Sequence, residues 1–180
     1  MFRLNKHICS IFMAIFMLFV ISADITIAGK TSKEKYLKAA YINNLLRFTQ
    51  WPDGYLNGDV NLCITGANPF GRAMQAIVER NKANGDIKLI ENIRPGAVGQ
   101  CDVIYISMFE QNDVPQLLIE AKAKKCLTIS DEPNFIASGG MVEFSEIRGK
   151  LSYIVNVKKL SEAGLSVNPL LLENAGKVIR

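Results

Sequence analysis

The sequence predicts an α/β fold: a single layered domain in which a mixed β-sheet is flanked by helices on both faces, with a C-terminal hairpin and two short helices. Three observations predict this fold class. Segments with helical spacing of apolar residues alternate with short strand-like segments from residue 33 to residue 131. Residues 102–107 are apolar on both faces, which is typical of a buried central strand. Residues 141–157 alternate in polarity around Arg148-Gly149, which is typical of a hairpin.

Residues 1–28 are predicted to be a signal peptide and are excluded from the fold. Arg3 and Lys6 precede an almost entirely apolar run at 8–21. This run is too short to span a bilayer comfortably, but it suits the apolar region of a secretory signal. We expect cleavage before Gly29, with Ala23 as the second choice. An uncleaved membrane anchor is the alternative.

The remaining domain, residues 29–180, has 152 residues (180 minus 28), enough for one sizeable core. Its charges are scattered, so nucleic acid is a poor candidate partner. The only histidine, His7, lies in the predicted signal peptide. Catalysis by Ser-His-Asp or Cys-His sets and metal sites built from histidine are therefore excluded as normally built. We predict no catalytic residue, no metal and no cofactor.

The first element of the domain is a predicted helix over residues 33–50. Pro52 prevents the helix from continuing, because a proline disfavours helical backbone in the residue before it. Trp51, the only tryptophan, therefore lies at a helix exit. Two interpretations stay open: Trp51 covers the core, or it belongs to a partner or ligand surface, where tryptophan is enriched. The apolar stripe of this helix comprises Leu37, Tyr41, Leu45 and Phe48.

Strands and helices then alternate. One helix is predicted to begin with an Asn68 cap and Pro69 in its first turn and to end near Gly85. A second helix is predicted from Asp113 to Lys125, with Pro115 in its first turn. The predicted strands are short segments at 60–66, 86–92, 102–107 and 126–131, and the first of them alternates between apolar and polar residues.

The segment "GANPFGRA", residues 66–73, has two glycines at the spacing of a phosphate-binding loop between a strand and a helix. The chemistry of such a loop is missing, because Arg72 replaces its lysine and Ala73 replaces the hydroxyl that holds magnesium. We interpret the segment as a turn followed by a helix start. A weak anion site at the helix N-terminus is the alternative.

The C-terminal part contains the predicted hairpin and two short helices. Gly164 separates the two helices, and Asn168-Pro169 begins the second one. Before the hairpin stands the turn of Ser138, Gly139 and Gly140. Two interpretations of this turn stay open: a turn that requires positive φ, or a place where a ligand or partner backbone approaches closely.

Three cysteines remain after the signal peptide, Cys63, Cys101 and Cys126, and an oxidising compartment permits disulfides. A bridge between Cys63 and Cys101 would close a loop of about 40 residues and stabilise the fold by about 4 kcal/mol in the chain-entropy model. Three buried free thiols are the alternative.

An ordered set of segments, "KAAYINNLLRFTQWP", "LCITG", "NPFG", "CDVIYIS", "LTISD", "FIASGGMVEF" and "IVNVKKLSEAGLSVNPLLLENA", resembles the YfiR family over about residues 35–178. The resemblance implies an exported, periplasmic, dimeric α/β protein that represses YfiN-type diguanylate cyclases. It also implies a disulfide between Cys63 and Cys101. Some members carry another cysteine pair around the Gly-Gly segment; here that segment has none, and Cys126 lies before it.

We therefore predict a non-catalytic periplasmic regulator that binds the periplasmic sensory domain of a membrane-bound diguanylate cyclase, without inserting into the membrane once the signal is cleaved. Its action would lower cyclic di-GMP and biofilm formation. The alternative is a periplasmic small-molecule sensor or carrier that acts with a transporter or a sensor kinase. The predicted partner or ligand surface comprises Trp51, Ser138, Gly139 and Gly140.

Overall fold

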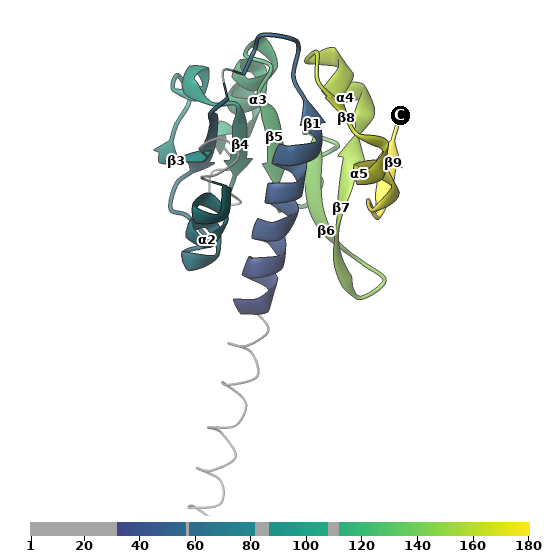
Figure 1. Cartoon of the computed structure of the whole chain (residues 1–180). Helices are drawn as coiled ribbons and strands as arrows, with labels where there is room; N and C mark the ends of the chain where they lie inside the picture. Colours follow the sequence, from purple (N-terminus) through teal and green to yellow (C-terminus); the bar gives the residue numbers. More distant parts are fainter. Residues whose placement is uncertain (1–31, 57, 82–86, 108–111) are drawn as a thin grey trace, which may run out of the picture.

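The computed structural model describes residues 32–56, 58–81, 87–107 and 112–180 (Figure 1). The predicted signal peptide, the alternative anchor and the predicted helix end near Gly85 lie outside these residues. In the described part of the chain, one mixed sheet has the strand order β3-β2-β4-β5-β6-β7-β9. Its strands are β2 (Val60–Thr65), β3 (Ile87–Ile93), β4 (Val103–Ile106), β5 (Leu127–Ser130), β6 (Val142–Ile147), β7 (Lys150–Asn156) and β9 (Lys177–Ile179).

The strands from β3 to β6 are parallel to one another, β7 pairs antiparallel with β6, and β9 pairs parallel with β7. Parallel neighbours need crossover connections, and the segments that contain α2 and α3 supply two of them. All four residues of β4 are buried, as the doubly apolar segment predicts for a strand covered on both sides. The predicted α/β fold class with a mixed sheet is confirmed.

Helices cover both faces of the sheet (Figure 1). The N-terminal helix, of which residues 32–48 are described, and α2 (Arg72–Asn81) share one apolar core with Leu62 and Tyr105 of the sheet. On the other face, α3 (Val114–Ala123) packs with Cys63 and Ile104. The short helices α4 (Val157–Glu162) and α5 (Pro169–Glu173) contribute to the first core. No described helix is long and apolar enough to cross a membrane.

The N-terminal helix ends at residue 48, so the prediction that it reaches residue 50 was wrong. Residues Thr49–Gln50 instead form strand β1, which pairs antiparallel with β8 (Ser166–Val167). The main-chain groups of β1 therefore form hydrogen bonds with β8, in the C-terminal part of the chain, and not within a last helical turn. The backbone leaves the helix before Trp51, and Thr49 lies opposite Val167.

Helix α2 begins at Arg72, four residues after the predicted cap. The Asn68 side chain caps a turn instead: its Oδ1 accepts a hydrogen bond from the Phe70 N–H at 2.9 Å. Gly71 then adopts a φ of +53°, in the left-handed region, so helical backbone starts only after it. The predicted helix start at Asn68-Pro69 was therefore wrong.

The hairpin and the last two helices were predicted correctly. Arg148 and Gly149 have φ values of +53° and +75°, as a two-residue turn with positive φ at both positions requires. At the start of α5, Asn168 Oδ1 accepts a hydrogen bond from the Leu170 N–H at 2.9 Å, and Pro169 occupies the first helical turn. Strand β9 had no counterpart in the sequence prediction.

Candidate functional site

A groove with an apolar floor lies between α3 and α4. It has a volume of about 310 Å³. Ile119 projects from α3 with 65% of its surface exposed, the largest fraction among the large apolar side chains described. The groove is lined by Leu118, Ile119 and Lys122 of α3, Ser138 and Gly139 of the turn before β6, and Lys159 of α4. We call it the α3–α4 groove.

The rim of the α3–α4 groove is cationic. Lys122 Nζ and Lys159 Nζ both contact Glu162 Oε2, at 3.2 and 3.0 Å. The hydrogen bond from Lys159, then that from Lys122, holds the pKa of Glu162 below its ordinary value. Two ammonium groups thus share one carboxylate, which leaves one unit of net positive charge beside an apolar floor. Charged rims around apolar centres are typical of protein contact surfaces.

Gly139 and Gly140 have different roles in the turn. Gly139 has a φ of +102° and lines the groove, so the predicted positive φ is confirmed at this position. Gly140 is buried, and a Cβ atom built on it would lie 2.2 Å from the ring of Phe135. Its N–H donates to Phe135 O at 2.9 Å. The close approach at Gly140 is therefore made by a side chain of the protein itself.

Trp51 is half-buried and packs against the larger core. Its Nε1 is buried and has no hydrogen-bond partner among the described residues. Trp51 also lines an open cavity with Pro52 and Gly164, whose lining shares no residue with the α3–α4 groove. The packing supports the interpretation of Trp51 as a cover of the core.

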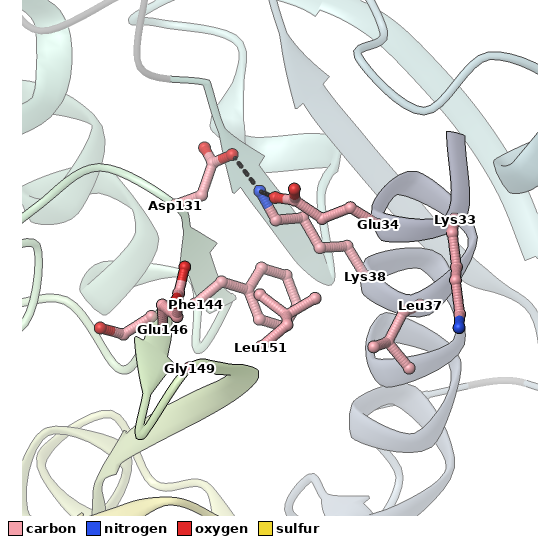
Figure 2. A pocket seen from close by; sticks show the side chains of 10 residues that line it. Lys33, Glu34, Leu37, Lys38, Asp131, Phe144, Glu146, Gly149 and Leu151 are labelled. Atoms are coloured by element: carbon pink, nitrogen blue, oxygen red, sulfur yellow. Dashed lines mark hydrogen bonds and ion pairs between the residues drawn. The ribbon is translucent and has the colours of Figure 1, made fainter. Parts of the chain in front are cut away.

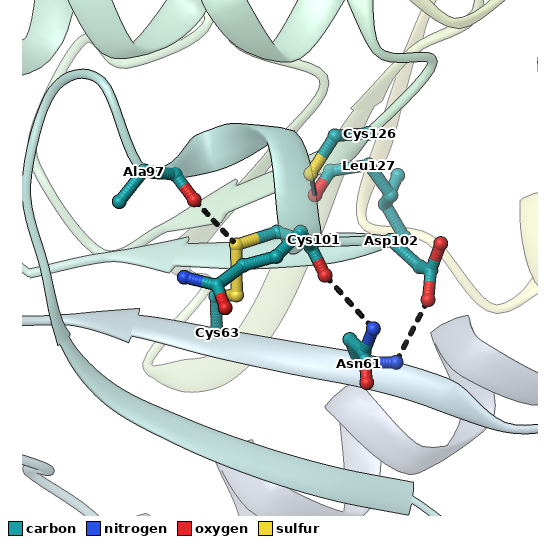
Figure 3. The surroundings of a disulfide bond; sticks show 8 residues. Asn61, Cys63, Ala97, Cys101, Asp102, Cys126 and Leu127 are labelled. Atoms are coloured by element: carbon teal, nitrogen blue, oxygen red, sulfur yellow. Dashed lines mark hydrogen bonds between the residues drawn. A yellow bond between two sulfur atoms is a disulfide. The ribbon is translucent and has the colours of Figure 1, made fainter.

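Cys63 and Cys101 form a disulfide, with their Cα atoms 5.7 Å apart, at the amino-terminal end of β4 (Figure 3). The implied bridge is therefore confirmed. Cys126 is unpaired and buried. Burial, and then the charge of Asp102, raises the pKa of the Cys126 thiol, so the reactive thiolate is disfavoured. The disulfide side of the domain has the properties of a structural centre.

A second cavity, of about 270 Å³, lies between the N-terminal helix and the β6–β7 hairpin (Figure 2). Lys38 Nζ contacts Asp131 Oδ2 and Glu34 Oε1, both at 2.9 Å. Burial alone would lower the pKa of Lys38, but the hydrogen bonds to Asp131 and Glu34 outweigh it and the pKa is raised. We call this the hairpin cavity; its apolar lining comprises Leu37, Phe144 and Leu151.

The predicted turn at "GANPFGRA" carries a feature unfavourable to an anion. Asn68 Nδ2 donates to Glu91 Oε1 at 3.0 Å, which places a carboxylate beside the turn. The first two N–H donors of α2 after Arg72, those of Ala73 and Met74, are bonded to Phe70 O and Gly71 O. The weak anion site at this helix start therefore lacks free donors there.

Comparison with known families decides the assignment. The model of the YfiR/HmsC-like family matches residues 35–176, most of the chain. The chain belongs to the YfiR/HmsC-like family. This family consists of periplasmic proteins that regulate diguanylate cyclase signalling rather than catalyse a reaction.

The fold of this YfiR/HmsC-like protein is similar to one solved structure, and a second solved structure matches it less well. One is a conserved domain protein from Vibrio cholerae O1 biovar El Tor, with a TM-score of 0.54 and 11% identity over 80% of this chain. The other is the ABC domain in complex with L-Trp from Streptococcus pneumonia, with a TM-score of 0.49 and 12% identity over 67% of this chain. The matched regions span 60% and 55% of those two chains. A search of curated proteins found no match.

The structure of this YfiR/HmsC-like protein separates the residues that were predicted as one surface. Ser138 and Gly139 lie in the α3–α4 groove, Trp51 lines another cavity, and Gly140 is buried. Sequence analysis did not identify Ile119 as part of a surface. The helical spacing in the sequence could have identified it. Val114, Leu117 and Ala121 form the buried face of α3, so Ile119 lies on the opposite, polar face.

Proposed function

We propose that this YfiR/HmsC-like protein represses a membrane-bound diguanylate cyclase by binding the periplasmic sensory domain of that enzyme through the α3–α4 groove. Repression lowers cyclic di-GMP and biofilm formation. The observation that carries the proposal is the exposed Ile119 over a groove with a cationic rim. In this proposal residues 1–28 are removed on export, and the mature protein acts in the periplasm as a homodimer.

The chemistry of the α3–α4 groove defines the surface that fits it. An apolar side chain of the sensory domain would fill the space between Ile119 and Gly139, and a carboxylate beside it would meet Lys122 or Lys159. Large apolar anchors at the centre of an interface supply most of its binding free energy. The charges at the rim mainly set the rate of encounter and the choice of partner.

The mechanism is thermodynamic and needs no catalysis. A repressor that binds the inactive state of the cyclase a hundredfold more tightly than the active state shifts that equilibrium by about 2.7 kcal/mol. A shift of this size moves a two-state enzyme from mostly active to mostly inactive. The same surface would then govern both binding and repression.

The proposal is tested by capture of the cyclase from solubilised membranes with the tagged mature protein. Wild-type protein should retain the cyclase, and Ile119→Ser should lose most of it. Leu170→Ser is the matched control, because Leu170 of α5 is also exposed, at 52%, and lies outside the groove. Equal capture by the two variants would reject the groove as the contact surface, and no capture by the wild-type protein would reject the proposed partner.

The alternative function, a periplasmic small-molecule sensor or carrier, is favoured by one observation, the hairpin cavity. A carrier retains its ligand through a gentle purification. Native mass spectrometry of protein taken from the periplasm should then show a bound small molecule, and protein found only at the mass of its polypeptide chains would reject the carrier.

A further inference from the structure

The hairpin cavity lies at the carboxyl edge of the parallel strands. Asp131 follows the last residue of β5, and Phe144 and Glu146 belong to β6, which begins beside the end of β5 (Figure 2). In open α/β sheets, ligands bind outside the carboxyl ends of the strands. The first turns of the N-terminal helix and the β6–β7 hairpin form the two walls of the cavity. The cavity therefore lies at the edge of the sheet where such ligands bind, and its lining residues are distinct from those of the α3–α4 groove.

The apolar part of the hairpin cavity is held in place by the core. Phe144 stacks with Tyr41, with ring centroids 6.1 Å apart, and Tyr41 Oη donates to Leu151 O at 3.3 Å. Leu37 faces Phe144 and Leu151 from the opposite wall (Figure 2). A small hydrocarbon group entering the cavity would thus meet a preformed apolar surface.

The polar part carries net negative charge. Glu34, Asp131 and Glu146 supply three carboxylates, and Lys38 is the one ammonium group that points among them (Figure 2). Lys33 also lines the cavity, but its ammonium group points away from Asp131 (Figure 2). Three carboxylates against the two ammonium groups of Lys33 and Lys38 leave one unit of net negative charge in the lining.

We propose that the hairpin cavity binds a small amphipathic amine in its protonated form. The hydrocarbon part of the amine packs on Phe144, Leu37 and Leu151, and its ammonium group meets the carboxylates of Glu146 and Asp131. Asp131 already interacts with Lys38 and Tyr105, but a carboxylate has about four lone-pair sites and can accept a further hydrogen bond. This inference goes beyond the proposed repression and does not depend on it.

Three probes of similar size test the proposal: 2-phenylethylammonium, 2-phenylethanol and 3-phenylpropionate. Calorimetric titration of the mature protein at low ionic strength should show that the amine binds about tenfold more tightly than the alcohol, and the carboxylate more weakly still. Equal affinities for amine and alcohol, tighter binding of the carboxylate, or no saturable binding of the amine would overturn the proposal.

A matched pair of variants assigns the binding to this cavity. Glu146→Gln should weaken the amine about threefold and leave the alcohol unchanged, because Glu146 is exposed and an exposed charge pair is worth little. Glu173→Gln removes an exposed carboxylate of α5, outside the cavity, and should change neither. Equal effects of the two variants on the amine would show attraction to the overall charge of the protein and reject the site.

Discussion

Cys63 in β2 is bonded through its sulfur to Cys101, which lies 38 positions further along the chain, immediately after the 3-10 helix η1 (Val98–Gln100). The bond joins β2, the second strand from one edge of the sheet, to the segment that leads into β4. Both cysteines are buried within the smaller core, on the face of the sheet that α3 covers. The bridge thus ties β2 to the start of β4 on the face of the sheet that α3 covers.

Removal of this bridge should destabilise the protein by about 4 kcal/mol, because a loop of this length loses its constraint in the unfolded state. The double variant Cys63→Ala/Cys101→Ala, unfolded in urea, should show this loss. Cys126→Ala is the matched control and should lose about 1 kcal/mol through a small cavity. In unfolded mature protein without reductant, one thiol of three should react. Three reactive thiols would contradict the bridge.

Stability should be lost at alkaline pH. The pKa of Lys38 is raised, as is that of Tyr105, the latter by burial and then by the charge of Asp131. A group with a raised folded-state pKa contributes its full stabilisation below its unfolded pKa and loses it as the pH rises through its folded pKa. Unfolding midpoints in urea should therefore hold up to about pH 10, the ordinary range of both groups, and fall above it.

The Lys38→Met variant separates the two alkaline contributions. It leaves Tyr105 in place and removes the ammonium group, so its midpoint should fall less steeply above about pH 10 than that of the wild type. The measurement is the urea midpoint of unfolding of both proteins between pH 7 and pH 11. Parallel curves for the two proteins would mean that Lys38 contributes no alkaline sensitivity.

Gly140→Ala should be destabilising although alanine is the smallest side chain that could be added. Its Cβ would lie 2.2 Å from Phe135, so the buried ring must move, at a cost of about 1–3 kcal/mol. The matched change is Gly99→Ala, where the nearest atom is the Cε of Lys124 at 3.5 Å and ordinary contact results. Chemical unfolding of both variants tests the comparison, and equal stabilities would refute it.

Substitutions of Trp51 test whether this residue stabilises the protein by packing on the core or by a hydrogen bond of its indole N–H. Trp51→Ala should cost about 3–5 kcal/mol through loss of packing. Trp51→Phe should cost much less, because it keeps an aromatic ring and removes an Nε1–H that has no described partner. Thermal unfolding of both variants measures the difference. A phenylalanine variant as unstable as the alanine variant would show that the indole N–H is satisfied in the folded protein.

The parts of the fold that were predictable have local signals. The four buried residues of β4 form an apolar run, and Gly149 in the turn of the hairpin is the residue type suited to positive φ. The β1–β8 ladder has no such signal, because each strand has two residues and pairs a segment near Trp51 with one near the C-terminus. Gly71 shows a further limit: its positive φ delays α2, although Asn-Pro is a common helix start.

The candidate sites were less predictable because they depend on contacts between distant segments. Lys38 and Asp131 are 93 positions apart and meet only when the N-terminal helix packs across the end of β5. The α3–α4 groove joins Ile119 to Lys159 in the same way. Ser138 and Gly139 could be identified from the sequence because two adjacent glycines before a strand indicate a turn. The residues that line the groove with this turn come from two helices, α3 and α4, and no local pattern predicts that contact.

The central claim, repression by contact through the α3–α4 groove, is tested most directly by cyclase activity. The measurement is the rate of cyclic di-GMP synthesis by the full-length partner cyclase in lipid nanodiscs as mature protein is titrated. The wild type should suppress synthesis, and Leu170→Asp should match it. Ile119→Asp should require about 30-fold more protein, the effect of losing a central anchor of about 2 kcal/mol. Full synthesis at saturating wild-type protein, or equal suppression by Ile119→Asp, would contradict the account.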